Sequence, residues 1–599
     1  MIPSENEAGG NEAGEQVHDQ LVVETAEALA GDVAIASVEP AASGAVASGG
    51  ISDSAVLKST ALMGVGTVTS RVSGLLRDTA QKAALGLFVV ADAFALGNTL
   101  PNIIYILIIG GALNAVFVPQ LVRHMKDDPD GGSAFADRLL TLVGLILIVV
   151  SVAAVLLAPW IVRIYATPEY SQSDLDLATA FARFCLPQIF FYGLYTMLAQ
   201  VLNARGHFGS PTFAPIVNNA VAIFTFLLFL AVAGTAAAAD GDLTPSQVAL
   251  LGIGTTLGVA AQALVLIPVL RRAGYRWRPR FDWRGQGLGR AGNLAAWTIG
   301  LVLVNQLAYI VVVRLATQAN VNASANGGIA AGLATYQTAH LMFVLPHSII
   351  TVSLVTALLP RMSRAAHDRA WSLVAADVGS GMRTVSALIV PAAAILVVLG
   401  PTLSVLLFNW GAADRPSTLA LGAVLSIFAL GLLPFSLYYV ILRGWYALED
   451  TRTAFWVTVV LNAVNLVIAV PLFNYVTTNS VGGVSGVAAL AISYVLSYWI
   501  TLGLAWVLLS RRLGGLQTGR TVRSLVRMLV AGVVSFGVMF GVLTLLIRVL
   551  PLSNKPLALV LAVVVSSVGI AAYLGAAWAM RISEVSEVVV LVRRRVGRH

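Results

Sequence analysis

The stretch ARGHFGSPTFAPIVNNAV (204–221) has a counterpart later in the chain, ALEDTRTAFWVTVVLNAV (447–464), at an offset of 243 residues. A second pair, VPQLVRHMKD (118–127) and LPRMSRAAHD (359–368), shares the order apolar–Pro–polar–apolar–x–Arg at an offset of 241 residues. Two matches at nearly one offset indicate a duplicated unit. We therefore expect the two halves of the chain to repeat one fold.

The composition predicts an all-α polytopic membrane protein. The chain has 599 residues, of which 58% are hydrophobic and 11% charged, and its mean hydropathy is +0.84. Soluble domains carry about 25% charged residues. A membrane-spanning helix needs about 20 mostly apolar residues. Fourteen segments meet this requirement, near 58–80, 95–122, 138–163, 178–202, 212–236, 247–270, 292–315, 329–359, 384–408, 418–443, 454–475, 483–510, 524–549 and 556–580.

The basic residues orient these spans. With both termini in the cytoplasm, 28 of the 37 Lys and Arg fall in cytoplasmic segments and 6 fall outside. This bias agrees with the preference of Lys and Arg for the inner side. The repeat then comprises spans 1–6 and spans 7–12, in parallel about an axis along the membrane normal, with two spans appended. Such folds place the substrate between the halves and alternate access by rocking them.

The segments outside these spans complete the predicted organisation. The N-terminal 55 residues hold ten Asp or Glu and no Lys or Arg, which is typical of a disordered acidic tail. The predicted domains are the cytoplasmic tail 1–55, a first lobe 56–275, a second lobe 276–515, two C-terminal helices within 516–585, and a basic tail 586–599.

The most basic loop is RRAGYRWRPRFDWRGQGLGR (271–290), which holds seven arginines. Its mixture of aromatic and basic residues suits a short helix that lies on the anionic lipids of the inner leaflet. The alternative is that the arginines act only as a topology signal.

The first span contains SRVSGLLRD (70–78), in which charged residues interrupt an apolar stretch. Each charge at the centre of a bilayer costs about 2.5–3.5 kcal/mol on insertion scales. Arg71 and Asp78 are seven residues apart and share a helix face, while Arg77 is rotated away from them. The group fits a cationic patch facing a wet cavity. Alternatively, with Lys82, it is an interfacial cluster at the outer end of the helix.

Further candidates lie in other spans. Arginines with few acids suit an anionic substrate, because the planar guanidinium matches phosphate oxygens. The asparagines of the second span fit either contact with the substrate or hydrogen bonds between helices. The arginine at the outer end of span 7 fits a side chain that extends to the membrane interface (snorkelling). The histidine of span 8 fits a hydrogen-bonded residue of the protein core. These candidates are Asp92, Asn98, Asn102, Asn114, Arg314 and His340.

The sequence lacks the residues or motifs for a disulfide, a metal site and ATP binding. The single cysteine, Cys185, excludes an intramolecular disulfide. We find no metal-binding spacing and no nucleotide-binding P-loop, so we expect no cofactor, no nucleic-acid partner, and transport driven by membrane potential or an ion gradient. Na⁺ prefers oxygen ligands, and four residues near span 11 with side-chain oxygens fit a Na⁺-binding site. The alternative is that these residues cap the helix and pack against its neighbours. They are Asp450, Thr453, Asn462 and Asn465.

Several stretches together resemble the MurJ/MviN lipid II flippase family, within the multidrug/oligosaccharidyl-lipid/polysaccharide exporter superfamily. The resemblance covers about residues 57–580 and rests on SRVSGLLRD, ADAF, LPN with AVFVP, LPQIFF with NARGHFGSPTFAPIVNN, LPHSIITVSLVTALLPRMSR and GWYALEDTRT. It implies fourteen helices, two six-helix lobes, and a hydrophobic groove shaped by the last two helices.

The resemblance also implies a function. The family moves lipid II, the undecaprenyl-pyrophosphate-linked peptidoglycan precursor, from the inner to the outer leaflet of the bacterial cytoplasmic membrane. It is not a family of enzymes. Its cavity arginines and aspartate match Arg71, Arg77 and Asp78, and its second-helix polar pair matches Asp92 and Asn102. The acidic tail would be free to recruit cell-wall synthesis or division proteins.

The sequence departs from the family pattern in two places. Many members have arginines directly after LPN, whereas this chain reads LPNIIYILIIGG. The usual cation of the eighth helix falls on Leu341, beside His340. We therefore expect Arg314 to be the counter-charge of the second lobe, with His340 as a weaker, pH-sensitive helper.

Three other functions remain as alternatives. Another exporter of the superfamily would carry a different polyprenyl-linked oligosaccharide. A polyprenyl-dependent glycosyltransferase would need paired acids in a sizeable outer loop, and the first outer loop offers only Asp92. A scaffold would act through its tails alone.

Overall fold

The computed structural model describes residues 53–107, 128–130, 132–207, 209–237, 241, 243–282, 292–325, 328–479, 485–549 and 555–586. These residues form helices and connecting turns, with no strand among them, as the sequence predicts. The chain divides into two compact units, Met1–Thr317 and Gln318–His599. The division falls inside helix α13, and the predicted lobe boundary after residue 275 stays a prediction. The acidic segment 1–52 and the basic segment 587–599 lie outside the described residues.

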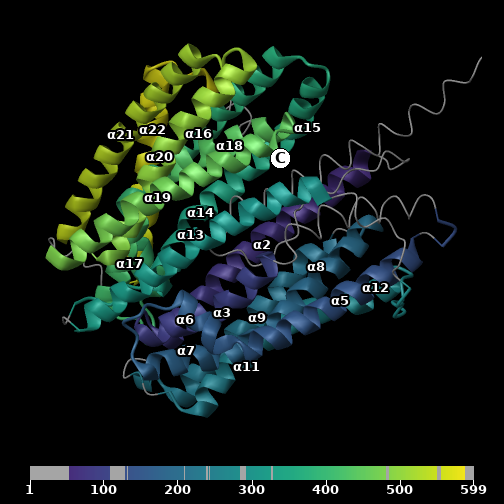
Figure 1. Ribbon diagram of the computed structural model, residues 1–599. Helices are drawn as coiled ribbons and strands as arrows, with labels where there is room; N and C mark the ends of the chain where they lie inside the picture. The colour runs from purple at the N-terminus through teal and green to yellow at the C-terminus, as the bar shows by residue number, and fades with distance from the viewer. Residues whose placement is uncertain are drawn as a thin grey trace, which may run out of the picture. The chain divides into compact units, whose positions relative to one another are not determined.

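The first unit is a helical bundle (Figure 1). Its helices are α2 (Asp53–Leu85), α3 (Val89–Tyr105), α5 (Ser133–Leu156), α6 (Ala158–Tyr165), α7 (Gln172–Cys185), α8 (Gln188–Ala204), α9 (Gly209–Ala233), α11 (Pro245–Leu264), α12 (Leu266–Arg272) and most of α13 (Gly292–Ala325).

Helix α9 organises the packing of this unit, because it contacts both α2 and α11. Glycines on α11 allow the second contact: a Cβ at Gly254 would collide with the side chain of Thr225, and one at Gly258 would collide with Asn218. Small residues at helix interfaces in membranes let backbones approach in this way. Helix α3 packs on α7, and α5 packs on α8.

The second unit repeats these pairings. Its helices are α14 (Leu333–His347), the π-helical turn η2 (Ser348–Val352), α15 (Ser353–His367), α16 (Trp371–Phe408), α17 (Arg415–Ala429), α18 (Leu432–Ala447), α19 (Thr451–Asn479), α20 (Gly486–Leu513), α21 (Thr518–Val549) and α22 (Lys555–Ala579). Helix α14 packs on α17, α16 on α18, and α19 on α20, as α3 does on α7, α5 on α8, and α9 on α11.

The break in the tenth predicted span also follows the repeat. Helices α17 and α18 meet at a 47° bend around Leu430 and Gly431. In the first unit, α7 and α8 are separated at Leu186 and Pro187, which lie 244 residues earlier. The duplication inferred from sequence is therefore visible in the helix boundaries and in the packing within each unit.

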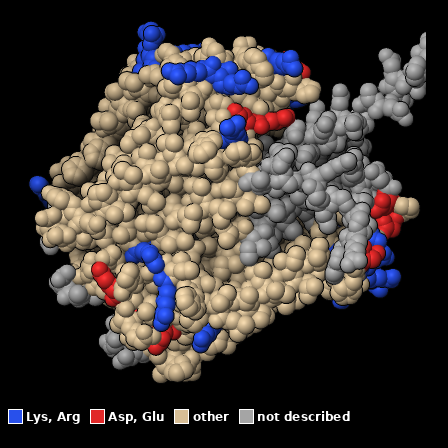
Figure 2. Space-filling model, viewed as in Figure 1, with Lys and Arg blue, Asp and Glu red and all other residues tan. Residues whose placement is uncertain are grey.

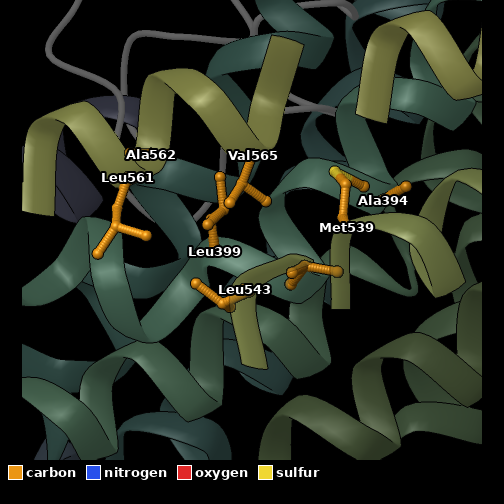
Figure 3. Packing of buried hydrophobic residues seen from close by; sticks show 8 residues of the cluster. Ala394, Leu399, Met539, Leu543, Leu561, Ala562 and Val565 are labelled. Atoms are coloured by element: carbon orange, nitrogen blue, oxygen red, sulfur yellow. The ribbon is translucent and has the colours of Figure 1, made fainter. Parts of the chain in front are cut away.

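The C-terminal helix pair packs on α16 through a continuous apolar cluster (Figure 3). Leu399 of α16, Met539 of α21 and Val565 of α22 are fully buried in it. At one end of the pair, Arg383 of α16 forms an ion pair with Glu584 just after α22, with Nε and Oε1 2.9 Å apart. These contacts attach the two appended helices to the second unit.

The outer faces of the helices suit a lipid environment. Many large apolar side chains are exposed, with Leu156 74%, Val467 73% and Trp578 81% accessible. Figure 2 shows broad areas free of charged residues on the face in view. Within the described ranges, eleven helices are long and apolar enough to cross a membrane, or twelve when α17 and α18 count as one span. Helices α2 and α3 are the remaining predicted spans, and the total of fourteen stays a prediction.

The orientation can be tested by labelling single cysteines in a Cys185→Ser background. We expect an impermeant thiol reagent added outside intact cells to label Glu169→Cys, Ser246→Cys and Asp414→Cys, which are exposed at turns predicted to lie outside. Matched exposed positions predicted to lie inside, Arg272→Cys, Asp368→Cys and Glu449→Cys, should react only after permeabilisation. Labelling of neighbouring turns from the same side would contradict the predicted topology.

Candidate functional site

Helix α2, whose sequence holds the charged group, packs against α9. The Ser73 hydroxyl donates to the Ser70 carbonyl at 2.9 Å, and the Thr79 hydroxyl donates to the Leu75 carbonyl at 3.0 Å. These bonds within the helix satisfy the hydroxyl groups of two half-buried side chains. The helix therefore continues through a sequence rich in Ser, Thr and Gly.

Arg77 is held by an acid from its own helix and an amide from α9. Its Nε and Nη2 donate to Oδ1 of Asp78 at 3.3 and 3.1 Å. Its Nη1 donates to Oδ1 of Asn219 at 3.2 Å. These bonds use three of the five N–H donors of a guanidinium. The side chain is 22% exposed, so the remaining donors can reach a ligand.

Asn219 joins the two helices. Its Nδ2 donates to the Ser73 hydroxyl at 2.9 Å and to the Ser70 carbonyl at 3.4 Å, while its Oδ1 accepts from Arg77. Gly74 leaves space beside this amide, because a Cβ at Gly74 would lie 3.8 Å from Nδ2. The role of Asn219 was not predicted, although APIVNN is among the stretches of the family resemblance.

The other α2 and α3 candidates lie at different depths. Arg71, which is half-buried, precedes Arg77 by six residues, or about 9 Å along the helix. Asp92 is completely buried in the first turn of α3, and Asn102 is half-buried further along that helix. The structure thus brings Arg77 and Asp78 together, and it places Asp92 away from any exposed surface.

A second polar network crosses the first unit at the start of α8. Gln188 is completely buried, and its Nε2 donates to Oδ1 of Asn98 at 3.3 Å and to the Thr256 hydroxyl at 3.1 Å. Its Oε1 accepts from the Tyr192 hydroxyl at 3.1 Å. Sequence reasoning missed this residue, which stands directly after Pro187 in LPQIFF. The network ties α3, α8 and α11 together.

Arg314 lies in the first unit. Its Nη2 donates to the backbone carbonyl of Arg163 on α6 at 3.2 Å. The contact is of the kind an arginine makes at a helix end. The expected role of Arg314 as the counter-charge of the second lobe stays a prediction.

His340 is buried in an aromatic cluster of the second unit. Its ring stacks on Tyr336 at 6.3 Å between centroids, and it contacts the edges of Phe428 and Tyr494. Its Nε2 is 3.2 Å from the Tyr494 hydroxyl. This environment matches the alternative of a satisfied core histidine, and the predicted role beside the substrate stays untested.

The four residues considered for a cation site do not surround one point. Asp450 caps α19: its Oδ1 accepts from the Thr453 amide at 2.9 Å, and its Oδ2 accepts from the Thr453 hydroxyl at 2.7 Å. Asn462 donates to the Thr458 carbonyl of its own helix at 3.0 Å, and Asn465 accepts from Ser493 at 3.1 Å. Asp450 and Asn465 lie about 22 Å apart along the helix axis, so the four cannot ligate one ion.

The described part of the basic loop after α12, residues 275–282, has no regular secondary structure. Residues 275–282 run along the start of α5, where Asp137 Oδ1 accepts from the Tyr275 hydroxyl at 2.7 Å. Arg138 Nη2 lies 2.7 Å from Oδ2 of Asp282. That hydrogen bond holds the pKa of the Asp282 carboxyl below its usual value, and burial raises the pKa of the Tyr275 hydroxyl.

The expectation of a short helix is therefore wrong for 275–282. Bonds to α5 satisfy backbone amides in this segment, since Asp137 accepts from Arg278 N at 3.1 Å and Thr141 accepts from Arg280 N at 3.1 Å. Residues 283–290 lie outside the described part of the chain.

Comparison with known proteins gives a consistent result. The family profile described as "Lipid II flippase MurJ" matches residues 82–565. A protein named probable lipid II flippase MurJ from Rhizobium meliloti (strain 1021) is 30% identical over 426 residues, which are 70% of this chain and 75% of that protein. Lipid II flippase MurJ of Burkholderia cenocepacia is 28% identical over 422 residues, 69% of this chain and 77% of that protein.

Solved structures share the fold. The inward closed conformation of lipid II flippase MurJ matches with a TM-score of 0.66 at 17% identity, over 87% of this chain and 98% of that one. The inward-facing conformation of a multidrug resistance MATE family transporter of the MOP superfamily matches with a TM-score of 0.58 at 14% identity, over 76% of this chain and 99% of that one.

The amide of Asn219 gives a first test of the site. Asn219→Leu removes the acceptor for Arg77 and both donors to α2, and hydrogen bonds to charged groups contribute about 1.5–3 kcal/mol each. We expect at least about a tenfold loss of transport with normal amounts of folded protein in the membrane. The control is Asn479→Leu, at an exposed amide that donates to the Tyr475 carbonyl of its own helix. If the two variants transport equally well, Asn219 is not part of the functional site.

Arg314 and Arg163 form a second matched pair. If Arg314 supplies charge to the transport path, Arg314→Gln should lower transport at least about tenfold, as expected for loss of a charge-assisted contact. Arg163→Gln should be near neutral, because the exposed Arg163 contributes its backbone carbonyl to the contact. Transport in vesicles is the measurement. Similar activities would make Arg314 an interfacial residue.

Proposed function

Because the chain belongs to the lipid II flippase MurJ family, we propose that it carries lipid II from the inner to the outer leaflet by alternating access, with Arg77 as a contact for the pyrophosphate. The observation that supports this role is the partly exposed guanidinium, held by Asp78 and Asn219 within an apolar bundle.

The geometry suits reversible binding of a phosphate. Asp78 holds Arg77 through one carboxylate oxygen, while two N–H donors stay outside the described bonds. A phosphate oxygen can use those donors first and then compete with Asp78 for the others. Exchange of one anion for another keeps the arginine paired throughout, which limits the penalty of moving charge through low dielectric. Arg71 would offer a second cation about 9 Å away along the helix.

The membrane potential is the proposed driving force. A pyrophosphate-linked head group carries negative charge, and moving it outward from a negative interior is favoured by about 2.3 kcal/mol per elementary charge for each 100 mV. The sequence holds no P-loop through which ATP could act. An ion gradient is the alternative source of energy.

Purified protein in vesicles, with a lipid II analogue, tests the proposal. We expect Arg77→Ala and Arg71→Ala each to lower flipping by at least about tenfold, and Arg77→Lys to recover only part of it, because lysine lacks the planar fork. An imposed inside-negative potential should raise the net outward rate of the unaltered protein. Full flipping by both alanine variants would contradict the assignment of the pyrophosphate contact.

A further inference from the structure

The polar network around Gln188 allows one arrangement of donors and acceptors. The Thr256 hydroxyl donates to the Phe184 carbonyl at 2.8 Å, so the Thr256 oxygen can only accept from Gln188. The NH₂ group of Gln188 therefore faces Thr256, with Nε2 and Oγ1 3.1 Å apart. Its carbonyl oxygen faces the Tyr192 hydroxyl, from which it accepts at 3.1 Å. Since an amide nitrogen carries two N–H donors, the second one is directed to Asn98, 3.3 Å away.

This arrangement determines which way the Asn98 amide points. Because Gln188 donates to it, Asn98 presents its oxygen, Oδ1, to Gln188 and directs its nitrogen, Nδ2, away. Within the described ranges, no hydrogen bond from Nδ2 is formed. Gln188 is completely buried, but Asn98 is half-buried. The network thus holds two N–H donors at an accessible position.

The face of α3 around Asn98 is polar. Asn98, Thr99 and Asn102 are half-buried, and Asn98 and Asn102 lie one turn apart on the same face of the helix. Gly97 fixes the placement of this face, because a Cβ at Gly97 would lie 2.8 Å from the backbone nitrogen of Ala182 on α7. Polar side chains within membrane spans usually face the bundle interior or a water-filled cavity. The partly accessible amides therefore suit a hydrated transport path.

Asn98 and Arg77 lie at similar depths in the two predicted spans. Helix α2 ends at Leu85, eight residues after Arg77, and α3 begins at Val89, nine residues before Asn98. Each residue is therefore roughly 12–14 Å along its helix from the turn that joins α2 to α3. Their chemistry differs, because the guanidinium suits a charged phosphate, whereas an uncharged amide donates equally well to a hydroxyl or amide oxygen. A ligand with a pyrophosphate next to a saccharide offers both kinds of acceptor.

We propose that Asn98 binds the saccharide–peptide part of the head group by donating from Nδ2 to an uncharged oxygen, and that Gln188 is the positioning residue that turns this amide toward the ligand. The inference rests on the proposed function, which supplies a substrate with such a head group. Asn98 then contributes to specificity: it adds affinity for a lipid that carries the saccharide, and none for the pyrophosphate alone. The completely buried Gln188 acts through Asn98 and does not touch the substrate.

The test compares the affinities of the purified full-length protein for two ligands: a lipid II analogue, and undecaprenyl pyrophosphate, which has no saccharide or peptide. Asn98→Leu should weaken binding of the analogue about three- to tenfold, as expected for one hydrogen bond between uncharged groups, and change binding of undecaprenyl pyrophosphate by less than about twofold. Gln188→Met should cause a selective loss of about two- to fivefold, because the Asn98 amide can then turn its oxygen outward. Ser151→Ala is the control: it removes a buried hydrogen bond to the Leu186 carbonyl, at the turn before α8, and should change both affinities by less than about twofold.

The outcomes separate the explanations. Equal losses for both ligands, or no loss for either in folded Asn98→Leu, overturn the contact with the saccharide–peptide part, and unchanged selectivity in Gln188→Met overturns its positioning role. Asn98→Asp keeps the acceptor for Gln188 and hence the network; it should also lower the affinity for the analogue relative to that for undecaprenyl pyrophosphate, and an unchanged ratio in this variant overturns the contact even if the leucine variant does not fold. Arg77→Ala is measured in parallel and should weaken binding of both ligands, since both carry the pyrophosphate. If Arg77→Ala binds both normally, the proposed function of Arg77 is wrong, whichever result Asn98 gives.

Discussion

The guanidinium of Arg77 can remain inside an apolar bundle because Asp78 and Asn219 hold it together. A charge at the bilayer centre costs about 2.5–3.5 kcal/mol on insertion scales, and paired or hydrogen-bonded charges avoid part of this. Asp78 lies next to Arg77 on α2, so the folding of that helix brings the two together. Asn219 can reach Arg77 only if α9 packs against α2 in one register. The contact between these helices therefore determines whether the charged group can form, and the glycines that bring α11 onto α9 hold that register from the other side.

Much of the fold could be predicted from sequence because it depends on local composition and on the repeat. Hydropathy fixed the approximate position of the spans, since each must supply enough apolar length to cross a bilayer. The repeat also relates positions in one half of the chain to positions in the other. The separation of α7 from α8 at Leu186 and Pro187 predicts a break near Leu430, where the second unit has its 47° bend. Gly431 and Pro434 mark the same place locally.

The partners of the site residues were beyond prediction because they depend on contacts distant in sequence. Asn219 lies 142 residues from Arg77, and Gln188 lies 90 residues from Asn98. Only the packing of α2 on α9, and of α3 on α8, brings them together. The prediction for segment 275–282 was wrong for the same reason: its composition favours an interfacial helix, but hydrogen bonds to Asp137 of α5 hold it in a non-helical conformation.

The repeat also shows that the charge is distributed unequally. At the offset of 243 residues that relates 204–221 to 447–464, Asn219 corresponds to Asn462 and Arg71 corresponds to Arg314. At the same offset the position of Arg77 is occupied by Asn320, and the position of Asp78 by Val321. The second copy thus keeps the amide and one arginine and lacks the ion pair. Asn320 and Val321 are both uncharged, so the second copy lacks the whole ion pair and keeps neither of its two charges alone. At these positions the second copy has two asparagines and an arginine, and the first copy has the ion pair to which we assign the proposed phosphate contact.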